Sequence, residues 1–325
     1  MDAIEGIKGN RFVVVGRVGM DLFPALGIAT EDAESFTADM GGSSANIAAG
    51  IVKLGGQASL VTRVSDDAVG RFCTNKLHHY GVDTTYVTPQ GGEARNSLAL
   101  YESRVAGHQS VIYRNGAADF EMTVADVEAV DYGQFTALVT AGTVFAAEPS
   151  RTAAFRAFAL ARAAGLPVIF DIDYRPYSWP SPQVAADVLS RAGAAADVIV
   201  GNDEEFGFMA GSIDKGLSKA RALAATSAQI VIYKMGEHGA ITFSEGQEMR
   251  TGIYPVEALK PTGAGDSFMA GLLSSIAAGH DLGAAVLRGS ACAAIVVAKP
   301  GCAPAMPDTQ ALEAFLASHP GPSET

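Results

Sequence analysis

The sequence predicts an α/β protein with one central, mostly parallel β-sheet flanked by helices. Short apolar runs rich in β-branched residues recur along the chain, and helical patterns stand between them. Strands that are apolar nearly throughout are typical of sheets covered on both faces, and their alternation with helices favours parallel βαβ units. The length of 325 residues suits one large domain, so we expect residues 1–325 to form a single unit.

Six apolar runs are the expected strands of this sheet. They are residues 11–16, 58–64, 135–142, 166–173, 196–202 and 228–236. Helical patterns follow between them, for example "SRTAAFRAFALARAAG" at 150–165, which a glycine closes, and "PQVAADVLSRAGAA" at 182–195. Because the ligands of open parallel sheets sit outside the carboxyl ends of the strands, polar residues just after these runs are the first candidates for a site.

Two segments interrupt this alternation. Residues 21–42 carry no helical period, and residues 96–116 show two alternating strands around the turn "VAGH". We interpret them as a small β-sheet outside the main one. It would form a lid over the edge of the main sheet, made from about 17–40 and 92–118.

Composition restricts the partners and the compartment. The balance of 23 basic and 35 acidic residues gives a net charge of −12, which opposes binding along the phosphate backbone of a nucleic acid. The longest wholly apolar run, 291–298, is far too short to span a membrane. The three cysteines, Cys73, Cys292 and Cys302, follow no metal or disulfide spacing. They suit a reducing compartment, so we expect a cytoplasmic protein without a signal peptide.

The stretch "LKPTGAGDSFMAGLL" at 259–273 is a candidate phosphate site. Gly263 and Gly265 precede a helical apolar pattern that begins after Asp266. Free N–H groups and the macrodipole at a helix N-terminus favour an anion, and glycines let a phosphate approach the backbone. Taken alone, the stretch fits equally well an ordinary loop in which Asp266 is an N-cap or first-turn acid.

A second glycine-rich helix start lies near the N-terminus. In "MGGSSANIAAGIVKLGG" at 40–56, a glycine pair and small polar residues precede a helix with Asn46 in its first turn. Taken alone, this stretch favours a plain capped helix, with Ser43 or Ser44 as the cap.

Together the two stretches resemble the two signatures of the ribokinase-like (PfkB) family of carbohydrate kinases, the early "GG…N.A" and the late "GAGD". The resemblance spans nearly the whole chain, in the expected order. It implies a ribokinase-like fold with a small β-sheet lid, and an enzyme that uses ATP and Mg²⁺ to phosphorylate a small molecule.

The resemblance also implies roles for individual residues. Asp266 would be the base that takes the proton from the substrate hydroxyl. The backbone amides of Gly263, Ala264 and Gly265 would form the anion hole for the transferring phosphoryl group. The residues implied to hold the sugar hydroxyls are Asp21, Gly42 and Asn46.

Two further motifs would serve the nucleotide. "GNDEEF" resembles the family's N-x-x-E, so Asn202 and Glu205 would organise Mg²⁺ and its waters around the phosphates. "KMGEHG" resembles a glycine-bearing nucleotide segment, which would bring Lys234, Gly236 and Gly239 near the phosphates.

Two arginines indicate that the substrate is an acid. "VIYRNGAAD" contains Arg114 on a predicted lid strand, and "DIDYRPYSW" contains Arg175 at a predicted strand end. Arginine binds a carboxylate in a planar, two-pronged fashion, which a neutral sugar does not need. The alternative is that each arginine pairs with a nearby protein acid, for example Arg175 with Asp171 or Asp173.

The segment "DIDYRPYSW" resembles one shared by 2-keto-3-deoxygluconate kinases and the 5-dehydro-2-deoxygluconokinases of inositol catabolism. In "YRNGAAD", "GNDEEF", "LKPTGAGD" and "CAAIVVAKPGCAPAMP" the chain looks closer to the second group. The expected reaction is therefore phosphate transfer from ATP to the 6-hydroxyl of 5-dehydro-2-deoxy-D-gluconate. The alternatives are 2-keto-3-deoxygluconate kinase, a fructokinase or nucleoside kinase, and a catalytically silent sensor of sugar acids or nucleotides.

One position departs from the family pattern. Many members have an acid six residues before the base, which helps to bind a monovalent cation, whereas this chain has Lys260. An ammonium group cannot ligate potassium and would repel it. We expect Lys260 to supply the positive charge itself; the alternative is a solvent-facing lysine. The resemblance also leaves open a homodimer formed through the lid.

Overall fold

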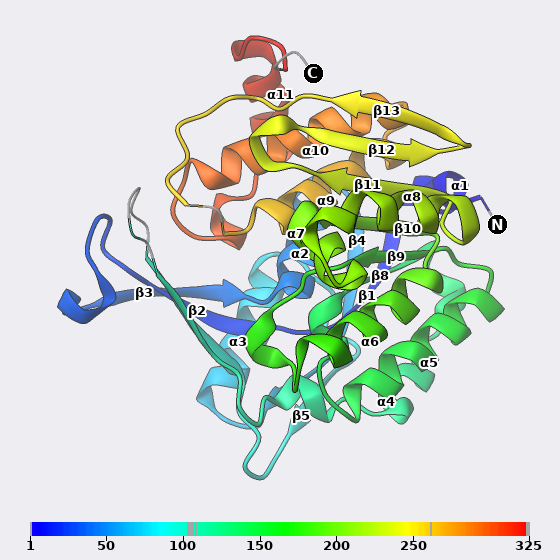
Figure 1. The fold of residues 1–325 in the computed structure, drawn as a ribbon. Coiled ribbons are helices and arrows are strands. Elements are labelled where there is room, and N and C mark those ends of the chain that lie inside the picture. Colours follow the sequence, from blue (N-terminus) through cyan, green and yellow to red (C-terminus); the bar gives the residue numbers. More distant parts are fainter. Residues whose placement is uncertain (1, 103–106, 108, 261, 323–325) are drawn as a thin grey trace.

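The computed structural model describes residues 2–102, 107, 109–260 and 262–322, which form a nine-stranded sheet and a smaller four-stranded sheet (Figure 1). The order in the large sheet is β13-β12-β11-β10-β9-β8-β1-β4-β5. Its strands are parallel from β11 to β5, and the hairpin of β12 and β13 adds two antiparallel strands at one edge. The prediction of a mostly parallel sheet is confirmed.

Six of these strands correspond to the six predicted runs, while β5, β12 and β13 were not predicted. The strands of the large sheet are β1 (Arg11–Val15), β4 (Gln57–Ser65), β5 (Val87–Gln90), β8 (Ala137–Ala141), β9 (Val168–Asp171), β10 (Val198–Asn202), β11 (Ile230–Lys234), β12 (Ala240–Ser244) and β13 (Gln247–Thr251). The hairpin of β12 and β13 turns at Glu245 and Gly246, whose φ angles are 53° and 75°. Two positive φ angles are the mark of a type I′ turn, which matches the twist of the flanking strands.

Helices cover both faces of the large sheet, as predicted. One face packs against α4 (Val124–Glu128), α5 (Ser150–Ala163), α6 (Pro182–Ala194), α7 (Asp203–Ala210) and α8 (Gly216–Thr226). The other packs against α1 (Ala3–Lys8), α2 (Ser43–Lys53), α3 (Ala68–His79), α9 (Ala264–Ala277) and α10 (Leu282–Val297). The last helix, α11 (Thr309–Ser318), packs against α10. Within the described part of the chain, no helix has the length and apolar character needed to cross a membrane.

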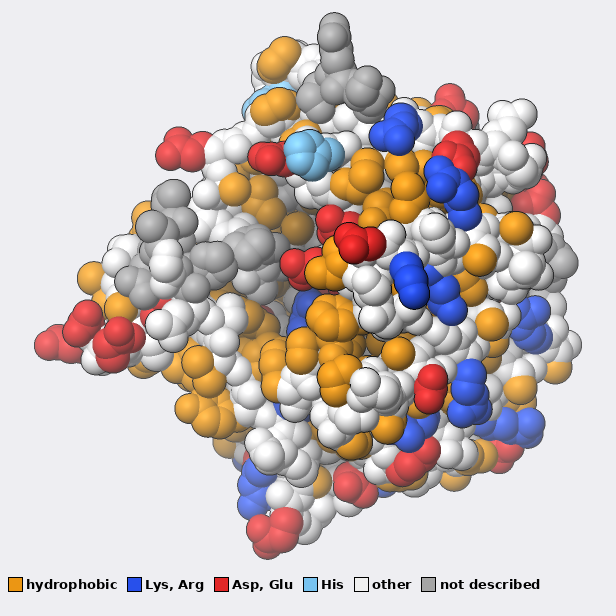
Figure 2. Space-filling model, in the orientation of Figure 1, with side chains coloured by type: hydrophobic (Ala, Val, Ile, Leu, Met, Phe, Trp, Pro, Cys, Tyr) orange, Lys and Arg blue, Asp and Glu red, His pale blue; other side chains and the backbone are white. Residues whose placement is uncertain are grey.

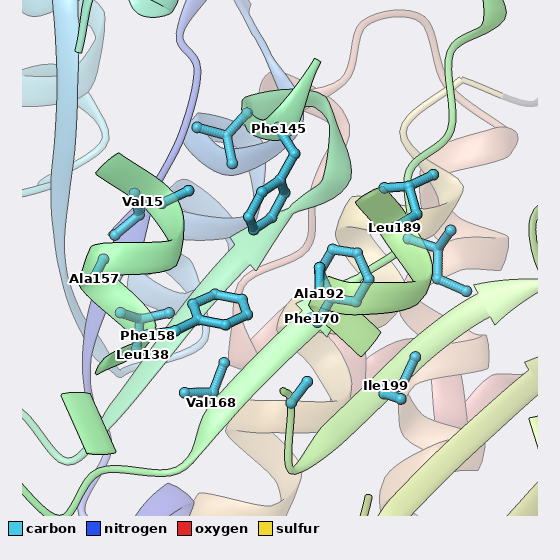
Figure 3. Packing of buried hydrophobic residues seen from close by; sticks show 14 of the residues in the cluster. Val15, Leu138, Phe145, Ala157, Phe158, Val168, Phe170, Leu189, Ala192 and Ile199 are labelled. Atoms are coloured by element: carbon cyan, nitrogen blue, oxygen red, sulfur yellow. The ribbon is translucent and has the colours of Figure 1, made fainter. Parts of the chain in front are cut away.

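The strands divide their side chains between two buried clusters. Val13 and Val15 of β1 face one cluster, and Phe12 and Val14 face the other, because successive side chains of a strand point to opposite faces. Figure 3 shows the first cluster, in which Phe145 meets Phe170 edge-on with ring centroids 5.9 Å apart. This double burial explains why the strand sequences are apolar nearly throughout.

The four-stranded sheet comes from the two segments that interrupt the βα alternation. Its order is β3-β2-β6-β7, with β2 (Gly19–Pro24), β3 (Phe36–Gly41), β6 (Ser97–Tyr101) and β7 (Ser110–Tyr113). The predicted turn "VAGH", 105–108, lies outside the described residues except for Gly107. In Figure 1 this sheet extends sideways from the main sheet.

Candidate active site

A cleft of about 1200 Å³ runs between the small sheet, the carboxyl ends of the parallel strands and the start of α9. Asp171, Asn202 and Lys234 line it at the ends of β9, β10 and β11, the edge at which open parallel sheets bind ligands. In Figure 2 the surface is hollowed between the small sheet and the body of the molecule.

Almost all of the predicted site residues line this one cleft. They are Asp21, Gly42, Asn46, Arg175, Asn202, Glu205, Lys234, Gly236, Gly239, Lys260, Gly263, Ala264, Gly265 and Asp266. The exception is Arg114, which is not among the lining residues. The cleft thus brings together residues predicted from motifs more than 200 positions apart.

The start of α9 has no side-chain cap. Gly263 is its N-cap residue, with φ of 84°, a left-handed conformation that glycine adopts without steric cost. Because no side chain accepts their hydrogen bonds, the first N–H groups of α9 remain available to a ligand. Gly263, Ala264 and Gly265 all line the cleft, so the helix presents an anion-binding terminus to it.

Asp266 lies in the first turn of α9 and does not cap it. Its Oδ2 accepts a hydrogen bond from Nδ2 of Asn46 at 2.9 Å. Burial, with a smaller contribution from the charge of Asp173, raises the pKa of Asp266 to about 6. The carboxyl group is therefore ionised at neutral pH and has a higher proton affinity than an exposed aspartate.

The start of α2 also lacks a side-chain cap, so the interpretation of Ser43 or Ser44 as its cap is wrong. Gly42 is the N-cap residue, with φ of 96° and no side-chain hydrogen bond. The Oγ of Ser43 instead donates to Oδ2 of Asp173 at 2.6 Å. The serines are buried, and their hydroxyl groups stabilise the neighbouring segments.

Asp21, on β2, explains the first glycine of the pair at 41 and 42. A Cβ at Gly41 would lie 1.8 Å from Oδ1 of Asp21, so only glycine leaves room for this carboxylate. Burial raises the pKa of Asp21 to about 7, although the positive charge of Arg17 acts in the opposite direction. A buried acceptor of this kind suits the hydroxyl groups of a bound sugar.

Asn202 and Glu205 form a capping box at the start of α7. The Oδ1 of Asn202 accepts from the N–H of Glu205, and Oε2 of Glu205 accepts from the N–H of Asn202, both at 2.8 Å. Each side chain thus uses one oxygen within the helix start. The box fixes the direction of the Glu205 carboxylate toward the cleft wall.

The carboxylates beside this box fit a hydrated Mg²⁺. Burial raises the pKa of Glu205 and raises that of Asp171 well above its usual range, although Lys234 opposes both shifts. A cation would stabilise such buried carboxylates in their charged form. No group of three or more acidic, histidine or cysteine side chains in the described ranges could hold a metal. A magnesium ion here would therefore complete its shell with water and phosphate oxygens.

Lys234 faces the start of α9. A Cβ at Gly265 would lie 3.6 Å from Nζ of Lys234 and 4.0 Å from Oδ2 of Asp171. The ammonium group of Lys234 also lies 5.3 Å from the centre of the Phe268 ring. A positive charge beside the free helix N–H groups strengthens the anion site.

The two arginines predicted for the substrate both form ion pairs with protein acids. Nη2 of Arg175 lies 2.7 Å from Oδ1 of Asp173, and Nη2 of Arg114 lies 2.5 Å from Oδ2 of Asp119. Arg175 lines the cleft. Arg114 is buried and also donates to the carbonyl of Thr143, so the substrate role predicted for it stays a prediction that requires this pair to open.

Lys260 is 2% exposed, so the alternative of a solvent-facing lysine is wrong. Its Nζ donates to the carbonyl oxygens of Thr262 at 2.6 Å and Val296 at 3.3 Å. Carbonyl oxygens are also ligands of resident metal cations. The ammonium group therefore occupies a cation-like position beside the loop that leads into α9.

Two features of the cleft were not predicted. Arg17, directly after β1 and the positive-φ Gly16, lines it and is 6% exposed. Its position two residues beyond the end of β1 was the available signal. An apolar wall, to which Val256, Val286 and Val297 contribute, had no distinctive sequence signal because such residues look like ordinary core.

Comparisons with known proteins identify the family of the chain. The family model "pfkB family carbohydrate kinase" matches residues 10–309. A 5-dehydro-2-deoxygluconokinase of Photobacterium profundum is 35% identical over 311 residues, covering 94% of each chain. One of Geobacillus kaustophilus is 34% identical over 314 residues, covering 95% of this chain and 94% of its own.

Solved structures share the fold. A double mutant of the Vibrio cholerae O395 fructokinase, in fructose, ADP and potassium ion bound form, has a TM-score of 0.83 at 26% identity, covering 94% of this chain and 98% of its own. The aminoimidazole riboside kinase of Salmonella enterica has a TM-score of 0.81 at 23% identity, covering 95% and 100%. The predicted ribokinase-like fold is confirmed, and the chain belongs to the pfkB family of carbohydrate kinases.

Proposed function

We propose that this kinase transfers the γ-phosphoryl group of ATP to the 6-hydroxyl of 5-dehydro-2-deoxy-D-gluconate. The names of the similar curated proteins support this substrate. The observation that carries the kinase reaction is the meeting of the Asp266 carboxylate with the uncapped start of α9 in one cleft. A base and a set of amide donors on one helical turn are what phosphoryl transfer to an alcohol requires.

In the proposed reaction, the 6-hydroxyl oxygen attacks the γ-phosphorus while the bond from that phosphorus to the β–γ bridging oxygen breaks. Asp266 accepts the hydroxyl proton, and ADP leaves with the bridging oxygen. The N–H groups of Gly263, Ala264 and Gly265 are proposed to stabilise the negative charge on the transferring group. Each such donor lowers the barrier by about 3–4 kcal/mol in comparable sites.

Asn202 and Glu205 are proposed to position Mg²⁺ through its waters, and Lys234, Gly236 and Gly239 to lie along the nucleotide phosphates. Bound Mg²⁺ would neutralise phosphate charge during the transfer. The apolar wall at Val256, Val286 and Val297 offers a surface for the flat adenine ring. A structural relative was solved with an ATP analog, which supports ATP as the donor.

For the sugar acid, Asp21, Gly42 and Asn46 are proposed to bind the hydroxyl groups. Arg175 is proposed to contact the acid end of the substrate from the cleft wall. Arg114 is proposed to contact the substrate only if its ion pair with Asp119 opens. The small sheet, whose Tyr101 and Ile112 line the cleft, is proposed to act as the lid.

The outer face of the small sheet is proposed to bind a second copy of the chain. The strand register puts Val111 opposite Leu100 and Tyr113 opposite Leu98, so these four side chains share the face turned away from Tyr101 and Ile112. Val111 and Tyr113 are 41% and 59% exposed. An apolar sheet face of this kind is unusual on a monomer.

The test of the function is an ADP-release assay with three acceptors: 5-dehydro-2-deoxy-D-gluconate, 2-keto-3-deoxygluconate and fructose. The wild-type enzyme is expected to use the first with the highest kcat/KM. A clear preference for either of the others would refute the substrate and leave the kinase reaction intact.

Asp266→Asn separates an enzyme from a silent sensor. Removing a general base typically lowers kcat by about 10²–10⁴-fold, while calorimetry should find ATP and sugar-acid affinities within a few-fold of wild type. If wild type and variant release ADP equally slowly with every acceptor, the sensor interpretation holds instead.

A further inference from the structure

Arg17 is a buried cation of the cleft with no carboxylate of its own. It is 6% exposed and lines the cleft. Among the described residues, Arg114 and Arg175 form ion pairs with Asp119 and Asp173, whereas no ion pair includes Arg17. The charges of the two predicted arginines are thus already neutralised, and that of Arg17 is not.

Among the described residues, the side chain of Arg17 makes one hydrogen bond. Nη1 reaches the Oγ of Ser97 only at 3.4 Å, near the upper limit for a hydrogen bond. Nε is buried and has no acceptor among the described residues. A guanidinium has five N–H donors. A buried charge without partners is energetically unfavourable, so a ligand that supplies hydrogen-bond acceptors would stabilise Arg17.

The backbone fixes Arg17 on the sugar side of the cleft. Its carbonyl oxygen accepts from the N–H of Ala45 at 3.2 Å, so it is attached to the start of α2, the helix that contributes Asn46. A Cβ at Gly42 would lie 2.7 Å from the same carbonyl, which shows how closely the two segments pack. Asp21 lies within electrostatic reach of Arg17 without forming an ion pair with it.

We propose that Arg17 binds the carboxylate of the sugar-acid substrate and thereby selects acids over neutral sugars. The inference rests on the proposed function, because it needs an acidic substrate. A planar guanidinium binds a carboxylate through two parallel hydrogen bonds, which would use the donors that the protein leaves free. Arg17 is thus a specificity-determining residue, distinct from the base and the anion hole.

The experiment compares 5-dehydro-2-deoxy-D-gluconate with its primary amide, which has a similar shape and no charge. The enzymes are wild type, Arg17→Gln, Arg17→Lys and the control Arg221→Gln, which removes an arginine from an exposed ion pair with Glu248. Losing one partner of a buried charge pair should lower kcat/KM of Arg17→Gln for the acid by about 10²-fold or more. Its kcat/KM for the amide should stay within a few-fold of wild type.

Arg17→Lys keeps the charge and loses the two-pronged geometry, so an intermediate loss on the acid alone is expected. If Arg17→Gln does not fold, as judged by thermal denaturation, Arg17→Lys replaces it in the comparison with wild type. Equal losses on acid and amide, or full activity of Arg17→Gln on the acid, would overturn the role of Arg17. Failure of the wild type to use the acid would instead refute the proposed function, so the two failures can be told apart.

Discussion

At the scale of single residues, the site buries carboxylates, which disfavours their charged forms, and neighbouring groups offset part of this energetic cost. Asp266 is buried and receives one hydrogen bond, from Asn46. Asp21 is buried on the small sheet and lacks such a donor among the described residues. Burial raises both pKa values, and the one with the donor is raised less, to about 6 against about 7.

The proposed role of Asp266 as the base predicts the pH dependence of the reaction. Its pKa in the folded protein is about 6, and only the ionised form can accept a proton. We therefore expect kcat/KM to be constant above this pKa and to fall about tenfold per pH unit below it. A rate profile from pH 5 to 8 measures this. In Asp21→Asn the limb near pH 6 should persist, and a flat profile in wild type would exclude Asp266 as the base.

The residues of the site differ in how readily they can be predicted from the sequence. Gly263, Gly265 and Asp266 could be found because a glycine-rich helix start has a local pattern. Arg17 had only a weak signal, its position shortly after β1, because its importance depends on which acids reach it in the folded chain. Arg114 was predicted from the sequence, with pairing to a protein acid as the alternative, but no spacing rule identified Asp119 as its partner.

At the scale of elements, the start of α9 combines two glycines with different tasks. At Gly263 a side chain would meet Val296 and Cys302 at 3.1 and 3.2 Å, on a backbone with φ of 84°. At Gly265 it would contact only Lys234 and Asp171, in the space of the cleft. The first glycine serves the turn, and the second is proposed to keep the anion site open.

Alanine substitutions should separate these tasks. Gly263→Ala forces a left-handed conformation that costs about 1–2 kcal/mol, so both the melting temperature and the activity should fall. Gly265→Ala should melt at or slightly above the wild-type temperature, because alanine favours the helix. Its methyl group should still lower kcat/KM by roughly 10²-fold by displacing the phosphate from the amides. Equal effects on activity and melting in both variants would contradict this division.

The loop before α9 contains the buried Lys260, which we propose replaces a monovalent cation. Since its ammonium group already binds the carbonyls of Thr262 and Val296, activity in KCl should equal activity in matched choline chloride. Lys260→Met should lower kcat by about 10²-fold, whereas Lys299→Met, at an exposed position, should not. Strong activation of wild type by KCl would refute the replacement.

Among the elements, strands buried on both faces were the easiest to predict, because their apolar runs are long and bounded by polar turns. The hairpin of β12 and β13 was not predicted. Its strand β12 is as long and as buried as β11, whereas β13 is mostly exposed, and only the turn at Glu245 and Gly246 marked the pair. The small strand β5, with Pro89 and no fully buried residue, carries almost no periodic signal.

At the scale of the whole molecule, the fold class followed from the βα alternation, whereas the arrangement of the small sheet did not. Its four strands come from two distant segments, 19–41 and 97–113. Pairing across such a distance depends on the register set by tertiary contacts, which local patterns do not contain. This register also determines which side chains face outward.

The apolar outer face of the small sheet predicts that the protein forms a dimer. If it joins two copies, light scattering after size-exclusion chromatography should give a dimer for wild type and a monomer for Tyr113→Glu, which buries a charge at the interface. Ile213→Glu, at a site that is 58% exposed on another part of the molecule, should remain dimeric. A monomeric wild type at micromolar concentration would contradict the proposal.

The hydrogen bond between Asn46 and Asp266 joins positions 220 residues apart in the chain. During synthesis, the segment that bears Asn46 leaves the ribosome long before the segment that bears Asp266. A nascent chain can therefore form most of its large sheet before Asp266, the proposed base, is in place. The capacity to consume ATP is therefore expected to arise late, when the segment from α9 onward docks.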